Sequence, residues 1–257
     1  MFSVNNKCVV IAGGLGKVGF PIVEGFLSNG SKVFIITSDS KKHKVKIEYL
    51  KSNYANNFFI FNMSIVSNKN IQTILDHIKK KFKTPDVFIN SAVQRPSQNY
   101  KKKNIRIENT IKSVNLNSKI IFLLLTTFAE TMKKNKNGAS IINISSVYGI
   151  KIPDDEIYKG TKYFTEIDYP FLKSGTIMLC KYLASKYGKY NLRINSLCLG
   201  GLKQANTNKK FKINYQKKTA LNRMMTQEDI VGPSIFLASK ASSYITGSVI
   251  ELDGGFF

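Results

Sequence analysis

Tyr169 and Lys173 are the residues of this sequence whose types and spacing most directly suggest chemistry. They lie four residues apart in a stretch with helical character, so on a helix they would share one face. A tyrosine hydroxyl has an ordinary pKa of about 10 and exchanges protons poorly at neutral pH, but a nearby ammonium group favours the phenolate. The pair therefore predicts a general acid/base at Tyr169. Because lysine is abundant in this chain, the pair by itself is weak evidence and needs support from the rest of the sequence.

A glycine-rich turn at residues 13–19 is the second candidate. It follows a short apolar run at residues 8–12 and precedes an amphipathic segment, as in a strand, turn and helix. Glycines there allow backbone N–H groups and the positive end of the helix to approach a pyrophosphate. Lys17, within the turn, either contacts a phosphate or points to solvent. The turn therefore predicts dinucleotide binding through the glycines at 13, 14, 16 and 19.

The elements that would position these residues alternate between strand and helix. Expected strands cover residues 8–12, 32–36, 58–61, 86–89, 140–144, 193–198 and 249–252, and expected helices cover 20–27, 70–82, 107–134, 169–187 and 227–238. This alternation predicts an α/β fold with a parallel sheet, helices on both faces and one domain over residues 1–257. Residues 148–168 and 200–222 are expected to be irregular, and such long loops are usually lids or substrate walls.

The charge of the chain is strongly positive. Of 39 basic residues four are arginine, and the formal net charge is +23. Nucleic-acid recognition depends heavily on arginine, so we expect no nucleic-acid partner. The abundance of lysine, asparagine and isoleucine is what AT-rich coding would produce. We interpret the charge as a solvated lysine surface, with attraction of an anionic small molecule or binding of a polyanion as alternatives. The lysines at 101–103 and 133–136 are expected at exposed loop or helix ends.

The sequence predicts neither a membrane protein nor a secreted one. Its longest apolar runs, such as residues 120–125, are too short to span a bilayer, and residues 1–7 lack the features of a signal peptide. We therefore expect a cytoplasmic protein. Cys8, Cys180 and Cys198 lie far apart within apolar runs, which is typical of buried thiols rather than of disulfides or a metal site.

Several short segments, in the right order and over essentially the whole chain, resemble the motifs of the short-chain dehydrogenase/reductase family. Residues 12–19 are similar to its TGxxxGxG turn, residues 90–92 stand at its NNAG motif, and Asn115 matches its active-site asparagine. Residues 142–149 resemble the segment with the catalytic serine, which alignment to SSxxG identifies as Ser146. Tyr169 and Lys173 fill YxxxK. Residues 193–195 match RVN, and residues 244–247 and 253–255 resemble the C-terminal signature.

The resemblance implies a Rossmann fold of about seven strands and an NAD(P)-dependent oxidoreductase. Tyr169 would exchange a proton with the substrate oxygen while a hydride passes between the nicotinamide and the attached carbon. Ser146 would hydrogen-bond that oxygen, and Lys173 would bind the nicotinamide ribose and depress the pKa of Tyr169. Asn115 would hold a water that links Lys173 to solvent. The structural alternatives are a strand-end cap for Ser146 and a helix hydrogen bond for Asn115.

The resemblance also implies a set of cofactor contacts. They are Gly13, Gly14, Leu15, Lys17, Val18, Ser38, Asn62, Met63, Asn90, Ala92, Gly200 and Leu202, together with Tyr169 and Lys173. The chain departs from the family where Lys17 replaces the second turn glycine and Ala12 replaces threonine. Pro170 disfavours helical angles at Tyr169, so we expect the helix to begin at or just beyond Tyr169 with Pro170 in its first turn.

The end of the second expected strand bears on the choice of cofactor. An acidic residue there would bind the 2′-hydroxyl of NAD and repel a 2′-phosphate. In this chain the corresponding residue is either Thr37 or Ser38, and neither is acidic. Asp39 is close enough to reach the ribose, whereas Lys41, Lys42 and Lys17 are available to a phosphate. We therefore favour NADP, with NAD as the alternative.

The long segment between Ser146 and Tyr169 bears on the substrate. Residues 157–161 resemble a subgroup of the family found in bacterial surface-polysaccharide and flagellin-glycan gene sets, which implies a sugar or nucleotide-sugar substrate. The alternatives are a longer loop or subunit contact, a reductase of acyl or small keto substrates, and a non-catalytic nucleotide-binding scaffold. The resemblance further implies a homo-oligomer, a dimer or tetramer, built through the long helices at 107–134 and 169–187.

Overall fold

The computed structural model describes residues 1–82, 84–93 and 107–257, so the lysines at 101–103 lie outside the described residues. Within these ranges the strands form one parallel sheet in the order β3-β2-β1-β4-β5-β6-β7. Their bounds are β1 Cys8–Ala12, β2 Lys32–Thr37, β3 Phe58–Asn62, β4 Val87–Asn90, β5 Ala139–Ser146, β6 Leu192–Leu199 and β7 Val249–Leu252. The strand order reverses direction between β1 and β4, where open α/β sheets bind their ligands.

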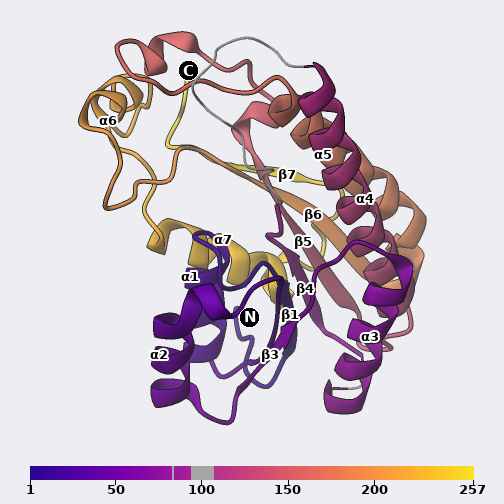
Figure 1. Cartoon of the computed structure of the whole chain (residues 1–257). Helices are drawn as coiled ribbons and strands as arrows, with labels where there is room; N and C mark the ends of the chain where they lie inside the picture. The colour runs from indigo at the N-terminus through magenta and orange to yellow at the C-terminus, as the bar shows by residue number, and fades with distance from the viewer. Residues whose placement is uncertain (83, 94–106) are drawn as a thin grey trace.

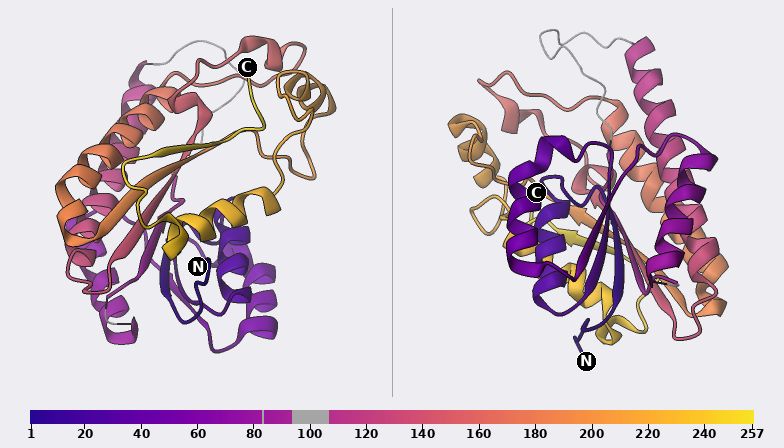
Figure 2. Two further views of the ribbon diagram at one scale, coloured as in Figure 1. Left: turned by 180° about the vertical axis from the view of Figure 1, so that it is seen from behind. Right: turned by 60° about the horizontal axis from the view of Figure 1, so that its bottom comes forward.

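Helices cover both faces of the sheet, as predicted (Figures 1 and 2). One face carries α3 (Asn68–Phe82), α4 (Ile107–Met132) and α5 (Asp168–Tyr187), and the other carries α1 (Gly19–Ser28), α2 (Lys44–Tyr54) and α7 (Glu228–Ala238). A short helix, α6 (Lys209–Gln216), and the 3-10 turns η1 (Lys41–His43), η2 (Val147–Gly149), η3 (Asp155–Tyr158), η4 (Gly188–Tyr190) and η5 (Lys240–Ser242) complete the described elements.

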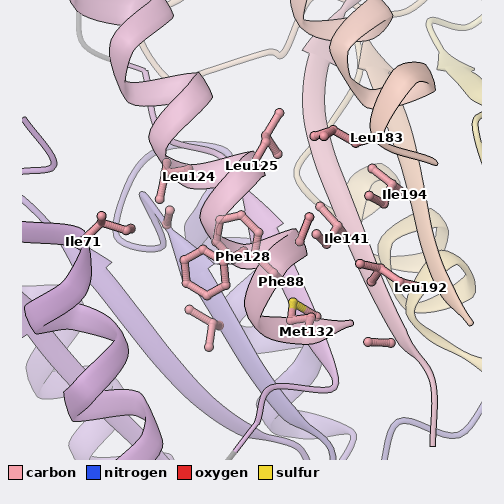
Figure 3. Close-up of a cluster of buried hydrophobic side chains, with 14 of the residues drawn as sticks. Ile71, Phe88, Leu124, Leu125, Phe128, Met132, Ile141, Leu183, Leu192 and Ile194 are labelled. Atoms are coloured by element: carbon pink, nitrogen blue, oxygen red, sulfur yellow. The ribbon is translucent and has the colours of Figure 1, made fainter. Parts of the chain in front are cut away.

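The sheet separates two hydrophobic cores. Its central strands are buried on both sides and therefore consist largely of apolar residues, as parallel strands do. In the core under α4, Phe88 and Phe128 stack with ring centres 3.7 Å apart (Figure 3). Cys8, Cys180 and Cys198 are buried free thiols, in agreement with the prediction.

A third, smaller cluster lies away from the sheet. Its buried members are Ile157, Tyr215, Met224 and Phe256, which come from η3, α6 and the segments before α7 and after β7. Figure 1 shows α6 and the last residues of the chain at the same end of the molecule. Ile157 and Tyr215 lie in stretches expected to be irregular, so these stretches contain packed structure.

Two helices were absent from the sequence-based expectation. Of the eleven residues of α2, Leu50 is buried, so its sequence gives almost no apolar periodicity. The eight-residue α6 falls within residues 200–222, which we expected to be irregular, and the Asn208 side chain caps it by accepting a hydrogen bond from Phe211 N at 3.1 Å. Helix α5 begins at Asp168, one residue earlier than expected, with Pro170 in its first turn. No helix among the described residues is long and apolar enough to cross a membrane.

Candidate active site

Tyr169 and Lys173 share one face of α5, as their spacing predicts. The Lys173 Nζ lies 5.7 Å from the centre of the Tyr169 ring. It also donates a hydrogen bond to the carbonyl oxygen of Ile144 at 3.3 Å, which fixes the lysine against β5. Both side chains are partly exposed, so a substrate and a cofactor can reach them.

Ser146 is buried at the end of β5. Its Oγ accepts a hydrogen bond from Tyr148 N at 3.2 Å and so caps η2. The capping role proposed as an alternative is thus present, but it uses the oxygen lone pair and leaves the O–H of Ser146 available to donate. The neighbouring Ser145 donates to the carbonyl oxygen of Lys173 at 3.4 Å, which connects β5 to α5.

Gly149 allows η2 to lie directly against α5. A Cβ atom at this position would be 2.7 Å from Ile177 Cδ1 and 3.0 Å from the backbone carbon of Lys173. The contact is completed by Ser174, whose Oγ donates to the carbonyl oxygen of Gly149 at 2.8 Å. The turn that follows Ser146 is therefore held close to the helix that carries Lys173.

Asn115 lies on the exposed side of α4, whereas Asn117 is buried. The Asn117 Nδ2 donates to the carbonyl oxygen of Ser113 at 3.0 Å, and the Ser113 hydroxyl donates to the Asp168 carboxylate, next to Tyr169. Asn115 therefore stays a prediction, and the buried Asn117 is a second polar candidate on the same helix. Asn117 is buried because it shares one face of α4 with Ser113, Ile120, Leu124 and Phe128 at helical spacing.

The turn between β1 and α1 has room for backbone and little else. Gly13 has φ of +76°, and a Cβ there would lie 2.8 Å from Ser91 O; a Cβ at Gly19 would lie 2.3 Å from Gly13 O. Gly16 N donates to Gly13 O at 2.9 Å and tightens the loop. This cradle at the start of α1 fits the pyrophosphate of a dinucleotide, because side chains that would block it are missing.

A cleft of about 220 Å³ opens beside this turn. It is lined by the predicted Gly13, Ser38, Met63 and Ala92. His43, Ile65 and Ile120 also line it and were not predicted, because nothing in their local sequence relates them to the glycine turn.

The other predicted cofactor residues lie at or near the same edge of the sheet with different surroundings. Gly14 and Leu15 are buried, Val18 is partly buried, and Lys17 is exposed. The exposed Asn62 uses its Oδ1 to accept a hydrogen bond from Ser40 N at 2.8 Å.

Asn90, Gly200 and Leu202 complete the predicted set. The buried Asn90 donates to Asn143 Oδ1 at 2.9 Å and accepts from Ala92 N at 3.2 Å, so it joins β4 to β5 and fixes the following turn. Gly200 lies close to the Tyr215 hydroxyl, and Leu202 forms an isolated parallel bridge with Met225.

Lysines around the glycine turn have specific partners. Lys46, from the unexpected α2, donates to the Leu15 carbonyl oxygen at 2.9 Å and lies 4.5 Å from the centre of the Phe20 ring. Burial lowers the pKa of its ammonium group. Asp39 pairs with Lys42 at 3.2 Å, and the hydrogen bond from Lys42 holds the pKa of Asp39 below its ordinary value.

A second tyrosine borders Tyr169. The Tyr148 ring meets the Tyr169 ring edge to face, with centres 6.5 Å apart. Its hydroxyl lies 3.3 Å from that of Tyr158, which in turn lies 2.6 Å from Thr165 Oγ1. Burial raises the pKa of Tyr148, so this residue stays protonated. Three hydroxyl groups from residues 148–165 therefore form a chain near the candidate acid/base.

The parallel sheet, glycine cradle and tyrosine–lysine helix define a nucleotide-dependent oxidoreductase of the α/β class. The family model described as "Enoyl-(Acyl carrier protein) reductase" matches residues 15–257. A crystal structure of a short-chain dehydrogenase from Leptospira borgpetersenii with bound NAD+ is 32% identical, covers 98% of this chain and 93% of its own, and superposes with a TM-score of 0.84. This chain belongs to the short-chain dehydrogenase/reductase family, whose members are oxidoreductases.

Two curated relatives are similar over nearly their whole length. Post-translational flagellin modification protein A from Campylobacter coli is 29% identical over 260 residues, with 98% of each chain covered. L-rhamnose-1-dehydrogenase from Scheffersomyces stipitis is 29% identical over 262 residues, which cover 99% of this chain and 97% of the relative. The predicted family and fold are thus confirmed.

Proposed function

We propose that this protein transfers a hydride between a nicotinamide cofactor and a carbonyl or secondary alcohol group of a sugar or nucleotide-sugar derivative in glycan biosynthesis. The observation that carries the proposal is the meeting of α5 with the end of β5. Lys173 is bonded to Ile144 O there, and Tyr169 lies one helical turn before it. Ser146 ends the same strand.

The residues of this chain have complementary tasks in such a reaction. Tyr169 gives a proton to the substrate oxygen in reduction and takes it back in oxidation. Lys173 places a positive charge near the tyrosine and so stabilises the phenolate that remains. Ser146 donates its O–H to the substrate oxygen, where negative charge develops. The bound nicotinamide supplies or accepts the hydride.

Asparagine at position 117 is our candidate for the polar residue of α4 that supports this group. It is buried and connects through Ser113 to Asp168, which precedes Tyr169. Asn115 keeps the family's sequence context but is exposed. A comparison of alanine substitutions at the two positions decides between them, as described below.

The cofactor would lie along the turn after β1. The glycine turn is suited to the pyrophosphate because it holds no side chains that would block the start of α1, and Ser38 lines the adjoining cleft. We favour NADP because no carboxylate lines that cleft among the described residues, and because Asp39 is neutralised by Lys42. The bound NAD+ in the Leptospira relative supports NAD as the alternative.

A sugar substrate is supported by two relatives and by the surroundings of Tyr169. One relative is named for flagellin modification and the other for oxidation of L-rhamnose. Hydroxyl groups of Tyr148, Tyr158 and Thr165 form a chain next to Tyr169, which suits a substrate with several hydroxyl groups. The description of the matching family model supports the alternative, an acyl substrate.

We further propose a cytoplasmic homo-oligomer that associates through α4 and α5. Large apolar side chains are exposed on both helices: Phe122 is 55% exposed on α4, and Phe171 and Met178 are 67% and 63% exposed on α5. Patches of this kind mark protein contacts. Light scattering would test the proposal, since a monomeric mass at micromolar concentration contradicts it.

The decisive experiment combines nucleotide titration with a substrate panel. We expect NADPH fluorescence to report binding to both the wild type and Tyr169→Phe, with weaker binding of NADH. The panel contains L-rhamnose, D-galactose, a uridine-diphosphate sugar and a 3-oxoacyl thioester. Turnover of a sugar by the wild type, reduced about 100-fold or more in Tyr169→Phe, supports the proposal. Turnover confined to the thioester favours the acyl alternative, and failure to bind either nucleotide contradicts both.

A further inference from the structure

Aromatic side chains from four separate segments meet in one group next to Tyr169. We call this group the aromatic cluster, and its members are Tyr148, Tyr158, Phe211, Tyr215 and Phe256. They come from η2, η3, α6 and the segment that follows β7. Phe211 stacks on Tyr158 with ring centres 5.6 Å apart and contacts Tyr215 at 5.9 Å. The cluster therefore connects segments that are distant in sequence.

Phe256 packs directly against two tyrosines, from which two branches of the cluster extend. Its ring lies 6.3 Å from the Tyr148 ring at an angle of 69°, and 5.2 Å from the Tyr215 ring in a stacked arrangement. Tyr148 continues to Tyr169 by an edge-to-face contact. The Tyr215 hydroxyl accepts a hydrogen bond from Gly201 N at 2.5 Å. One ring thus packs against the tyrosine that borders the candidate acid/base and against the tyrosine that binds the turn after β6.

The position of Phe256 is fixed by its backbone as well as by its ring. Lys151 Nζ donates to the Phe256 carbonyl oxygen at 2.6 Å and to Asp253 Oδ2 at 2.6 Å. Gly254 and Gly255, both with positive φ, form the turn before it. Phe256 is 4% exposed, whereas the adjacent Phe257 is 73% exposed. The two neighbours therefore have the same chemistry and opposite environments.

We propose that Phe256 is a positioning residue for hydride transfer, because it fixes Tyr148 against Tyr169 and Tyr215 against Gly201. The proposal rests on the function proposed above. It means that one wall of the substrate site is packed before the substrate arrives, so that little ordering has to take place on binding. Removing the ring takes away a packing partner from both tyrosines at once. A displacement of about 1 Å at a reacting group costs on the order of 100-fold in rate.

The first test measures kcat and the KM for nucleotide in Phe256→Ala, Phe256→Leu and the control Phe257→Ala. Rates are divided by the concentration of nucleotide-binding sites, so that loss of folded protein does not count as loss of rate. We expect Phe256→Ala to lower kcat about tenfold or more with the KM for nucleotide nearly unchanged. Phe256→Leu should lower kcat by a smaller factor than Phe256→Ala, and Phe257→Ala should equal the wild type. A wild-type kcat in Phe256→Ala overturns the proposal.

The second test does not require turnover. Gly201 N is bonded to the Tyr215 hydroxyl and Tyr148 N to Ser146 Oγ, so hydrogen exchange at these two amides reports the two branches. We expect Phe256→Ala to accelerate exchange at both about tenfold, with the amides of β1 unchanged and Phe257→Ala like the wild type. Unchanged exchange at both amides overturns the proposal even if the wild type converts no substrate, in which case the proposed function fails separately.

If the alanine variant does not fold, hydrogen exchange is measured in Phe256→Leu instead. The smaller apolar side chain still fills part of the site. Faster exchange at Gly201 and Tyr148 in this variant supports the proposal, and wild-type exchange rates at both amides contradict it.

Discussion

The β1–α1 turn and the aromatic cluster lie at two sides of the candidate active site and are built in opposite ways. The turn exists because side chains are missing, since a Cβ at Gly13 or Gly19 would lie within 3 Å of backbone atoms. The cluster exists because large rings are present, in contact at 5.2 to 6.3 Å between ring centres. The turn should therefore fail when atoms are added and the cluster when atoms are removed.

The largest effect is expected from Gly19→Ala. Its new Cβ would lie 2.3 Å from Gly13 O, so the turn has to open and the pyrophosphate cradle is lost. We expect the dissociation constant for NADPH to rise at least about 100-fold, equivalent to about 2.7 kcal/mol. Fluorescence titration measures it. The control is Gly232→Ala in α7, where a Cβ meets nothing within 4 Å and should stabilise the helix by about 0.5–1 kcal/mol. Normal NADPH binding by Gly19→Ala would show that the turn tolerates an added Cβ atom.

Gly149→Ala tests whether the substrate side of the site, like the glycine turn, is disrupted when atoms are added. Gly149 belongs to η2, on the substrate side, yet its Cβ would press on Lys173 and Ile177. We expect kcat to fall about 10- to 100-fold, because the added methyl group pushes η2 away from α5. Nucleotide binding should be retained. Steady-state kinetics with a parallel NADPH titration checks this. A normal kcat would mean that the catalytic side, unlike the turn, accepts added atoms.

The variants Asn117→Ala and Asn115→Ala lie on α4, outside both regions, and their effects are a reference for the variants within those regions. The Asn117 amide is buried and bonded to Ser113, so its loss should cost about 1–3 kcal/mol of unfolding free energy and reduce turnover. Asn115 is exposed, and its loss should change stability by less than about 0.5 kcal/mol. Urea unfolding and kcat measure both. If Asn115→Ala lowers kcat more than Asn117→Ala does, the position expected from the family motif is correct.

Tyr158→Phe removes one hydroxyl from the aromatic cluster and keeps the ring. The hydroxyl lies between Tyr148 and Thr165, and its loss should cost about 0.5–1.5 kcal/mol. The matched control is Tyr163→Phe, at an exposed position that contacts the same Phe211 ring. We expect thermal unfolding to shift downward in the first variant alone. An effect as large as that of Phe256→Ala would show that the hydroxyl groups, rather than the rings, hold the cluster together.

The smallest effect concerns pH and the ion pair that holds the segment before Phe256. Burial alone would raise the pKa of Asp253, but hydrogen bonds from Lys151 and Gly255 N hold it below its ordinary value of 3.8. A carboxyl with a lowered pKa contributes stability above pH 3.8 that is lost as the pH falls below it. We expect acidification to lower the free energy of unfolding by less than about 1 kcal/mol. Near-ultraviolet circular dichroism of the tyrosines measures the change. Lys151→Met should reduce this pH dependence; an unchanged dependence would assign it to other carboxyl groups.

The two regions also differ in how far the sequence predicted them. The glycine turn is contiguous, and the strands β1 and β7 occupy the residues expected, because short apolar runs between turn residues give a local signal. Tyr169 and Lys173 were recognisable because a helix brings positions four apart together. In each case the relevant interactions are between near neighbours in sequence.

The aromatic cluster could not be predicted, because its contacts join residues up to 108 positions apart, from Tyr148 to Phe256. Nothing local distinguishes Phe256 from Phe257. The family motif predicts Asn115, whereas the structure buries Asn117 two residues later on α4, and the alanine variants described above decide between them. Helix α2 was missed because its one buried residue, Leu50, leaves no periodic pattern.

The third cluster shares no buried residue with the two cores of the sheet. Substitutions in it should therefore alter the wall beside Tyr169 before they weaken the packing of the sheet itself. Descendants of one ancestral enzyme could exchange this unit as a whole, acquiring a new substrate while keeping the same hydride chemistry. For protein engineering, the segments 148–168, 209–225 and 253–256 are accordingly the ones to transplant together.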